Sequence, residues 1–318
     1  MIRLGLIGAG PNGTGNIRGC TANPARCQLV AVADPNEKAA QAAAKEFKID
    51  KVVADFEDML PDIDAVIISS PNWLHPEQAI ACAEAGKHVW IEKPMALSTV
   101  DADRICDAVD KAGVKSFIGF SVRFAASSRT LKNTLTSETI GNLRSIWSRR
   151  CCDIRKGITG WRTDFAKTGG VLSELLAHEI DWMIDIAGDP TSIYCRIQAD
   201  NQESPRSNDH VWMTLGFKNG ATGTIEGAQN AIIADFFKGI IGSQGSVSTR
   251  NWGQDVYLCD RNGDRKVEKV EAFDKHSHFL DIIEGKAESV ANVHCARKVV
   301  YISEKALESA VTNQVVAL

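Results

Sequence analysis

The sequence predicts an α/β protein in which a doubly wound parallel sheet is followed by a mostly antiparallel sheet domain. In the first third of the chain, short apolar runs alternate with helical patterns, the order of elements that builds a parallel sheet covered by helices. The first apolar run leads directly into a glycine-rich turn. Past about residue 121, apolar and polar residues alternate between glycine turns, which indicates antiparallel strands. We therefore expect one domain over 1–121 and a second over 122–318.

The first strand, 2–7, runs into a Gly-x-Gly-x-x-Gly turn made by Gly8, Gly10 and Gly13. In this motif the first glycine permits the tight bend, the second lets backbone amides approach a pyrophosphate, and the third lets the following helix pack closely. The unpaired N–H groups at the start of that helix, around Pro11 and Asn12, favour an anion. By itself the motif is also compatible with a flexible glycine-rich loop.

A second apolar run, 28–33, ends at Asp34, which lies 21 residues beyond the last glycine and matches the spacing of a ribose-binding acid. A carboxylate at this position accepts hydrogen bonds from the ribose hydroxyls and repels a 2′-phosphate, so we expect NAD rather than NADP. Pro35 and Asn36 supply no arginine for a phosphate, although Lys38 leaves NADP open. Asp34 could also cap the next helix. Strand, turn, helix, strand and acid together predict a Rossmann dinucleotide-binding domain.

The remaining elements follow from the same alternation. Further strands are expected at 52–53, 65–69, 88–91 and 116–120, and helices at 39–47, 76–85 and 99–111. Gly86 and Gly113 stop the last two helices. In the second domain, Asn219-Gly220 within the alternating run 211–226 predicts a hairpin, and the polar stretch 200–208 predicts an exposed loop.

The composition is that of an ordinary globular protein. With 318 residues, of which 44% are hydrophobic and 24% charged, the chain can bury the cores of two domains. No run approaches the ~18 apolar residues of a membrane helix, and a strand that begins at Ile2 leaves no room for a signal peptide, so a cytoplasmic location is expected. The net charge of −4 gives no sign of nucleic-acid binding.

The nine cysteines are scattered and include no Cys-x-x-Cys pair, so we expect neither a disulfide framework nor a zinc site. The neighbours Cys151 and Cys152 should alternate on a strand, with one side chain in the core and the other outside. No other spacing typical of metal ligands occurs, and no metal is expected.

Two groups of polar residues follow strands of the first domain, at the carboxyl edge where open α/β sheets bind ligands. Ser70, Pro71, Asn72 and His75 follow the fourth strand, and Glu92, Lys93 and Pro94 follow the fifth. We expect all of them beside the cofactor. A lysine after a strand is, however, usually a solvated charge.

A third group lies on a helix expected over 169–181. Glu174 and His178 are four residues apart, and His178 and Asp181 three apart, so each pair would share a helix face. A carboxylate beside a histidine fixes the tautomer of the ring and raises its basicity, as general bases require. Taken alone, a Glu–His pair at this spacing is more often a surface ion pair.

Together these residues resemble the Gfo/Idh/MocA family of NAD(P)-dependent sugar and polyol oxidoreductases along nearly the whole chain. The resemblance rests on the glycine turn, Asp34, the runs 70–75 and 85–89, Glu92-Lys93-Pro94, Arg123-Phe124, 140–144, Trp161-Arg162 and 169–181. It implies a Rossmann domain followed by an α/β domain whose large open sheet faces substrate and a partner subunit, with a homodimer or homotetramer expected. It also implies that Lys93 and His178 meet the substrate hydroxyl over the nicotinamide.

Several positions depart from the family pattern. Glu174 stands where aspartate is usual, Thr168 replaces one residue of a triple glycine, Leu176 stands where a small residue is often found, and no proline follows Phe124. These departures alter shape more than chemistry, although the longer side chain of Glu174 displaces its carboxylate.

Reference pKa values assign the roles. The pKa of a lysine, about 10.4, would have to fall by about 3 for the amine to act as a base at pH 7, which costs about 4 kcal/mol, whereas a histidine near 6.5 needs almost no change. We therefore expect His178 as the base, Glu174 as the residue that orients it, and a charged Lys93 that stabilises the reacting oxygen. Arg123, Trp161 and Arg162 are expected at the nicotinamide end of the cofactor pocket.

The expected substrate is a sugar, cyclic polyol or sugar acid oxidised at a secondary alcohol. A group of basic residues could attract an acidic sugar or a phosphate, or could be a solvated strand face or a dimer rim: Arg149, Arg150, Arg155, Lys156 and Lys167. The same fold also serves catalytically inactive NAD(P)-binding regulators and NAD-dependent glycoside-cleaving enzymes. The presence of both Lys93 and His178 favours a dehydrogenase over a regulator.

Overall fold

The structure, a computed structural model, describes residues 1–154, 159–198 and 210–318. These residues form two compact units, one of Met1–Gly119 with Asp274–Val300 and one of Phe120–Phe273 with Tyr301–Leu318. The boundary after Gly119 lies close to the one expected from the sequence. The segment Asp274–Val300 belongs to the first unit, whereas the sequence had suggested that all of 122–318 forms the second. The polar stretch 200–208 lies outside the described residues.

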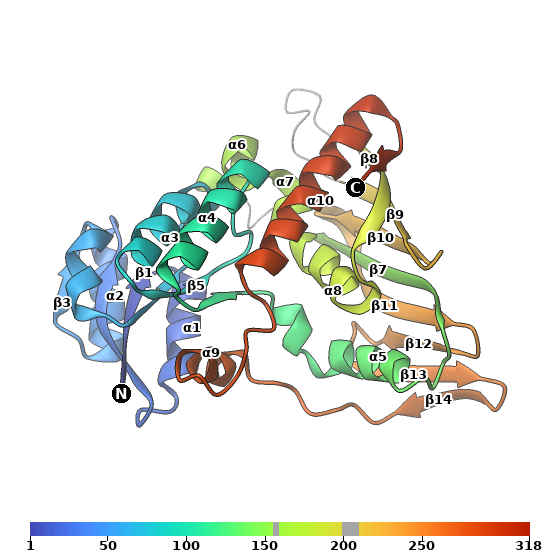
Figure 1. Cartoon of the computed structure of the whole chain (residues 1–318), viewed down its shortest axis with the longest axis horizontal. Helices are drawn as coiled ribbons and strands as arrows, with labels where there is room; N and C mark the ends of the chain where they lie inside the picture. The colour runs from blue at the N-terminus through green and yellow to red at the C-terminus, as the bar shows by residue number, and fades with distance from the viewer. Residues whose placement is uncertain (155–158, 199–209) are drawn as a thin grey trace. The chain divides into compact units, whose positions relative to one another are not determined.

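The first unit is built on a six-stranded parallel sheet, as the sequence predicted (Figure 1). Its strands are β1 (Ile2–Ile7), β2 (Cys27–Ala33), β3 (Lys51–Val53), β4 (Ala65–Ile68), β5 (His88–Ile91) and β6 (Ser116–Ile118). Their order in the sheet is β3-β2-β1-β4-β5-β6. This order reverses between β1 and β4, which is the point where sheets of this type bind ligands.

Helices of the first unit follow the strands in sequence. They are α1 (Pro11–Thr21), α2 (Glu37–Phe47), α3 (His75–Glu84), α4 (Thr99–Ala112) and α9 (Lys275–Ile283). The side chain of Asn36 caps α2 by accepting a hydrogen bond from the N–H of Ala39, so the capping role considered for Asp34 belongs to Asn36. Gly113 ends α4 with a left-handed φ of 66°.

The segment Asp274–Val300 completes the core of the first unit. Phe279 of α9 packs edge-on against Trp90 of β5, with ring centroids 5.3 Å apart. Farther along, the N–H of Ile118 on β6 donates to the carbonyl of Ala291 at 2.7 Å. The side chains of Trp90 and Phe279 are both fully buried. This late segment therefore supplies packing and a backbone hydrogen bond to strands from the first third of the chain.

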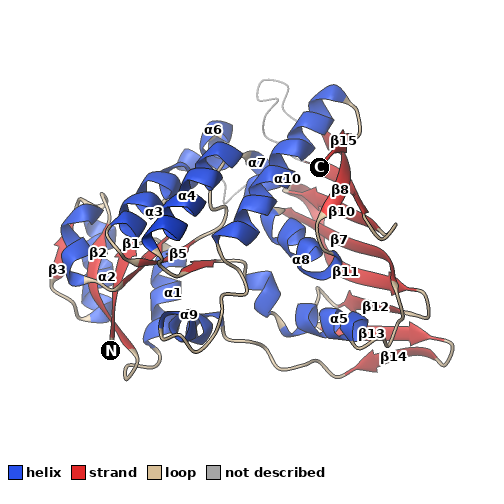
Figure 2. Cartoon of the chain, in the orientation of Figure 1, coloured by secondary structure: helices blue, strands red, loops and turns tan. Residues whose placement is uncertain are grey.

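The second unit contains a nine-stranded sheet in the order β14-β13-β12-β11-β7-β10-β9-β8-β15 (Figure 2). The strands are β7 (Leu143–Asp153), β8 (Pro190–Gln198), β9 (His210–Phe217), β10 (Thr222–Ala228), β11 (Asn230–Gly242), β12 (Ser246–Arg250), β13 (Asp255–Asp260), β14 (Gly263–Val267) and β15 (Val316–Ala317). All neighbouring pairs are antiparallel except β7 and β10, which are parallel. The predicted hairpin at Asn219-Gly220 joins β9 to β10, and Gly220 takes the positive φ that the turn requires.

Helices cover one face of this sheet. Those that begin in the second unit are α5 (Ala126–Thr136), α6 (Phe165–Thr168), α7 (Gly170–Glu174) and α8 (Ala177–Ala187), and α10 (Val293–Thr312) enters it at Tyr301. In the described part of this unit, α5 and α8 lie along the same side of the strands, and no helix lies along the other side (Figure 2). The sheet therefore has one buried and one open face. Among the helices of the described ranges, none has the length and apolarity that crossing a bilayer requires.

Candidate active site

The glycine turn joins β1 to α1 at the carboxyl edge of the first sheet. Gly8 has a φ of +89°, and a Cβ there would lie 2.7 Å from the backbone of Ser69. A Cβ at Gly13 would overlap the carbonyl oxygen of Gly8. Around Gly10, by contrast, no described atom lies within 4 Å of the position that a Cβ would take. Gly8 and Gly13 are thus required by the packing of the turn itself, whereas Gly10 leaves room for a ligand.

The first turn of α1 is suited to an anion. Gly10 occupies the N-cap position without a capping side chain among the described residues, and Pro11 follows at the start of the helix. The N–H groups after it, beginning with that of Asn12, have no partner one turn earlier in the helix, which leaves donors for a phosphate. Space at Gly10 and free donors beyond it together fit a pyrophosphate.

The carboxylate of Asp34 is fixed beside this turn. One oxygen accepts the N–H of Ala9 and the other accepts the N–H of Asn36, both at 2.7 Å. Each carboxylate oxygen can accept a second hydrogen bond. Asp34 is therefore oriented by the backbone and retains the capacity to accept ribose hydroxyls. Lys38, which left NADP open, is exposed on α2.

His75 ties together the segments that follow β4 and β5. Its Nδ1 lies 2.8 Å from the carbonyl oxygen of Pro94, and its Nε2 lies 2.9 Å from that of Ser70. The ring is buried at the start of α3, next to the buried Asn72. Both ring nitrogens of His75 thus face backbone carbonyls, and the protonated one donates to its carbonyl, so the ring braces the two segments on which Ser70, Pro71 and Lys93 lie.

Glu92 is attached to α1. One carboxylate oxygen accepts a hydrogen bond from the side-chain amide of Asn16 at 2.7 Å, and the amide oxygen accepts one from Lys275 of α9 at 2.9 Å. A Cβ at Gly119 would lie 2.5 Å from this carboxylate, so glycine there lets the Glu92 side chain keep its present position. Lys93, the next residue, is half-buried, and the Lys93-Pro94 peptide bond is cis. Glu92 therefore holds the end of β5 against α1, next to Lys93.

The single helix expected over 169–181 is wrong, because the structure breaks it at Leu175 and Leu176. Glu174 is the last residue of α7, and His178 is the second residue of α8. The break buries both leucines, and the side chain of Leu176 packs where Gly227 of β10 has no Cβ. The four-residue spacing of Glu174 and His178 is therefore not a shared face of one helix. His178 itself is buried, with its ring edge-on to Phe120 at 6.3 Å.

Arg123 and Asp181 form a buried fork within the second unit. The Nε and Nη2 groups of Arg123 donate to the two oxygens of Asp181 at 2.7 and 2.6 Å, and its Nη1 donates to Asp185 at 2.9 Å. Burial raises the pKa of Asp181 to about 6, although the fork favours the ionised form. The sequence analysis had placed Arg123 at the nicotinamide end of the cofactor pocket. It had placed Asp181 on the same helix face as His178. In the second unit this pair fastens α8, and the expected role of Arg123 at the cofactor stays a prediction.

A second buried ion pair, which the sequence analysis missed, lies one residue after His178. The Glu179 carboxylate is completely buried and lies 2.7 Å from the ammonium group of Lys238 on β11. Glu179 also accepts hydrogen bonds from Ser148 at 2.6 Å and Arg150 at 3.1 Å. Burial alone would raise the pKa of Glu179, but Lys238 and Arg150 outweigh it and hold the pKa below its usual value. No local spacing could reveal this pair, because Glu179 and Lys238 are far apart in the sequence and come together only in the folded protein.

The other basic and aromatic candidates are also in contact with partners. Arg162 stacks on Trp161 at 4.5 Å within a 3₁₀ turn (Gly160–Thr163). Arg149 lies 3.2 Å from Glu226, and Lys167 lies 3.5 Å from Asp164. Arg149 and Arg150 are neighbours on β7 and project from opposite faces of the sheet. Arg155 and Lys156 lie outside the described residues.

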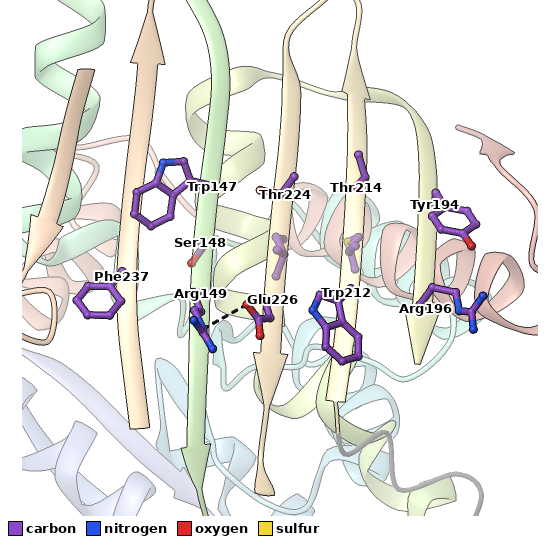
Figure 3. Close-up of a pocket in the computed structure, with 12 residues that line it drawn as sticks. Trp147, Ser148, Arg149, Tyr194, Arg196, Trp212, Thr214, Thr224, Glu226 and Phe237 are labelled. Atoms are coloured by element: carbon purple, nitrogen blue, oxygen red, sulfur yellow. Dashed lines mark ion pairs between the residues drawn. The ribbon is translucent and has the colours of Figure 1, made fainter. Parts of the chain in front are cut away.

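The open face of the second sheet carries an aromatic pocket of about 610 Å³ (Figure 3). Side chains from the consecutive strands β11, β7, β10, β9 and β8 project into it. They include Trp147, Arg149, Tyr194, Trp212, Glu226 and Phe237. Figure 3 shows the Arg149–Glu226 ion pair between the aromatic rings. Trp212 remains 42% exposed on this face.

The predicted site residues thus form one group in each unit. The first unit brings together, at the carboxyl edge of its sheet, Gly8, Gly10, Pro11, Asn12, Gly13, Asp34, Ser70, Pro71, Asn72, His75, Glu92, Lys93 and Pro94. The second unit holds Arg123, Trp161, Arg162, Glu174 and His178. A glycine turn with space for a pyrophosphate and an oriented ribose-type acid define the first unit as a dinucleotide-binding domain of the Rossmann class.

Comparison with known families agrees with this class. Residues 2–120 match the model of an oxidoreductase family with an NAD-binding Rossmann fold, and residues 128–248 match the GFO/IDH/MocA C-terminal domain. The chain belongs to the GFO/IDH/MocA family of oxidoreductases, and its first unit contains the family's NAD-binding domain. The family, the fold class and the NAD-binding domain predicted from the sequence are confirmed.

Individual relatives are similar over most of their length. The myo-inositol 2-dehydrogenase of Thermotoga maritima is 29% identical over 278 residues, which cover 83% of this chain and 80% of that protein. The 1,5-anhydro-D-fructose reductase of Ensifer adhaerens is 28% identical over 255 residues, covering 79% and 76%. Among solved structures, levoglucosan dehydrogenase in complex with NADH has a TM-score of 0.89 at 23% identity, covering 99% of this chain and 98% of that one. The structural likeness shows the shared fold.

The different surroundings of Gly10 and Gly13 predict different effects of an added methyl group. Gly10→Ala should change the free energy of unfolding by less than about 1 kcal/mol, because its backbone is extended and its surroundings are open. It should weaken NADH binding at least about tenfold, since the methyl group enters the pyrophosphate space. Gly13→Ala should destabilise the protein by about 1–3 kcal/mol. Urea unfolding and NADH fluorescence titration measure the two quantities, and unchanged NADH affinity in Gly10→Ala would contradict the assignment.

The buried Glu179–Lys238 pair predicts non-additive stability effects. Lys238→Met should destabilise the protein by about 3 kcal/mol or more, because Glu179 keeps only Arg150 as a cationic partner in the core. Adding Glu179→Gln to that variant should restore part of the loss, since the uncompensated charge is removed. Urea unfolding of the two single variants and the double variant tests this coupling. Losses that simply add would show that the pair does not act as a unit.

Proposed function

We propose that the protein is an NAD-dependent dehydrogenase or reductase that transfers a hydride between the cofactor and a secondary alcohol or ketone of a sugar, cyclic polyol or sugar acid. The observation that carries this proposal is the carboxyl edge of the first sheet, where open space at Gly10, an uncapped helix start and the oriented carboxylate of Asp34 occur together. The names of the sequence relatives refer to myo-inositol and 1,5-anhydro-D-fructose, which supports a sugar or polyol substrate.

In this proposal NAD supplies the hydride chemistry, and the protein supplies position and proton transfer. His178 takes the proton of the substrate hydroxyl during oxidation and returns one during reduction. Lys93 remains charged and stabilises negative charge on the reacting oxygen. Glu174 supplies the carboxylate that orients His178. The two residues lie on either side of the break between α7 and α8 rather than on one helix face. The Arg123–Asp181 and Glu179–Lys238 contacts support these roles because they hold α8, on which His178 lies.

Charge pairing favours a neutral substrate over an acidic one. Arg149 lies between Glu226 and Asp235, and Arg150 is paired with the buried Glu179. Both arginines are therefore already neutralised by carboxylates. Within the described residues, they offer no unpaired cation for a uronic acid or a sugar phosphate.

We also propose that the protein is a homodimer or homotetramer, in the cytoplasm, in which the open sheet face meets a second copy. The face carries Trp147, Trp212 and Phe237, a concentration of aromatic side chains typical of the core of an interface. One patch that meets itself across a twofold axis gives the closed dimer that most homo-oligomers use. Burial of the exposed Trp212 would be the main favourable contribution to the free energy of association.

The interface proposal predicts that Trp212→Glu lowers the assembly state. A charge at the centre of an apolar interface must be desolvated against the partner copy, which opposes association. Light scattering coupled to size exclusion should give a smaller particle for this variant than for the wild type. Trp252→Glu, at an exposed tryptophan outside the pocket, provides the matched control. Equal masses for the wild type and Trp212→Glu would reject this face as the interface.

The catalytic proposal predicts separate losses of turnover and binding. Lys93→Ala and His178→Ala should each lower kcat by about 100-fold or more, because each removes a group that acts on the reacting oxygen or its proton. NADH should still bind to His178→Ala. The measurement is reduced-cofactor absorbance with NAD or NADP and a panel of inositols, aldoses, anhydrosugars and uronic acids. Lys115→Ala and His294→Ala are the controls, since both lie outside the proposed site.

The outcomes distinguish the proposal from its alternatives. Full activity in both Lys93→Ala and His178→Ala would reject the assigned roles. Tight NADH binding without turnover of any substrate would favour an inactive regulator of the same fold. Released aglycone in product analysis of glycoside substrates would favour NAD-dependent glycoside cleavage.

A further inference from the structure

We propose that Cys151, His210 and Glu226 form a binding site for a divalent metal ion of the zinc type on the open face of the second sheet. One ligand atom from each residue, a sulfur, a ring nitrogen and a carboxylate oxygen, lies within 4.8 Å of the other two. These are the three kinds of protein ligand that Zn²⁺ takes. The site is separate from the nucleotide edge of the first unit and is not needed for the proposed hydride transfer.

Strand register explains why these three side chains meet. Ala228 of β10 is the partner of Cys151 on β7 and also of His210 on β9, so the two ligands flank one small residue from adjacent strands. Glu226 lies two residues before Ala228 and therefore projects from the same face. The methyl group of Ala228 leaves the space above it to the three longer side chains. Because the backbone positions are fixed by the sheet, the ligand positions do not depend on a flexible loop.

Two of the ligands are already oriented. The Nε2 of His210 and the Oε1 of Glu226 are 3.1 Å apart, close to the spacing of about 3.3 Å between neighbouring ligands in a tetrahedral zinc site. The ring of His210 is stacked on Trp212 with 3.7 Å between centroids, which fixes its plane. Cys151 is 2% exposed, and the other two side chains are each about one-quarter exposed. Together with the sulfur of Cys151 they make a three-ligand set, which leaves a fourth position for water.

The neighbouring charges balance when the ion is bound. Arg149 contacts Cys151 and lies 3.2 Å from Glu226 and 3.4 Å from Asp235. A guanidinium next to a cation is unfavourable unless acids compensate it. With the ion bound, the negative charges of the Cys151 thiolate, Glu226 and Asp235 equal the positive charges of Arg149 and the divalent ion. Asp235 is the register partner of Cys151 on β11 and can hold Arg149 when Glu226 turns to the metal.

The test is metal titration of the untagged, chelator-treated full chain. Co²⁺ should bind at one per chain with a thiolate-to-cobalt charge-transfer band, Zn²⁺ should abolish the band, and Mg²⁺ should not compete. Cys151→Ser should eliminate the band, and His210→Gln should weaken binding more than about 100-fold, since even residues outside the ligand set contribute 10–100-fold. Zn²⁺ should raise the Tm of the wild type but not of these variants.

Two matched controls should leave binding unchanged. Cys152→Ser changes the neighbouring thiol, which projects from the other face of β7. His294→Gln changes a histidine whose ring nitrogen lies 3.1 Å from Asp110, the same separation as in the His210–Glu226 pair, but without a cysteine. Urea unfolding of each variant checks that the second unit, which carries Cys151, Cys152 and His210, is folded. His210→Gln, at a partly exposed position, tests the site even if Cys151→Ser fails to fold.

Three results would overturn the proposal. The first is the absence of a saturable cobalt band in the wild type. The second is an equal loss in Cys152→Ser and Cys151→Ser, which would indicate chelation by the neighbouring thiols. The third is unchanged affinity in His210→Gln, which would indicate adventitious metal on the surface.

Discussion

Two completely buried carboxylates, Glu179 and Asp181, anchor helix α8, and the candidate site of the second unit depends on them. Glu179 reaches Lys238 and Ser148 on the sheet, and Asp181 is forked by Arg123. Charges in a protein interior are tolerated only when their partners are in place. The two sets of partners therefore restrict both the rotation and the position of α8. His178 precedes Glu179 directly on α8, so its backbone position is fixed together with the helix.

The nucleotide edge of the first unit is held in a different way. Its main constraints are steric, because Gly8 and Gly13 bring backbone segments closer than any Cβ would permit. The polar residues of this edge then link the segments sideways, His75 between two carbonyls and Glu92 through Asn16 to α1. Such a framework is preorganised, so the groups that would contact a dinucleotide are held in place before it binds. His75 and Glu92, which the sequence placed beside the cofactor, therefore also brace the segments of this edge.

The local features of this fold could be predicted from the sequence, while the distant pairings could not. The strand at 88–91 matches β5 to the residue, because its apolar run is bounded by charged side chains. The helix over 169–181 failed because its periodicity continues across Leu175 and Leu176, where the structure ends α7 and begins α8. Leu176 packs against Gly227 on a strand that is distant in the sequence. Glu179 and Lys238 likewise have no common motif.

The same distinction applies to the two candidate sites. The glycine turn and Asp34 lie within a single βαβ unit, so their spacing along the chain reflects their spacing in the fold. Cys151, His210 and Glu226 lie on three strands, and only the sheet register aligns them. A search for ligand spacings along the chain therefore could not detect the metal site that we propose from cross-strand register.

The assignment of Asp274–Val300 to the first unit makes that unit a discontinuous domain. Residues 1–119 alone would leave Trp90 without Phe279 and Ile118 without the carbonyl of Ala291. During synthesis, the strands of the nucleotide sheet emerge long before α9 does, and residues Phe120–Phe273 of the second unit are made in between. Completion of the cofactor domain is thus linked to translation of the last fifth of the chain, and a truncated product lacks the buried surface that stabilises residues 1–119.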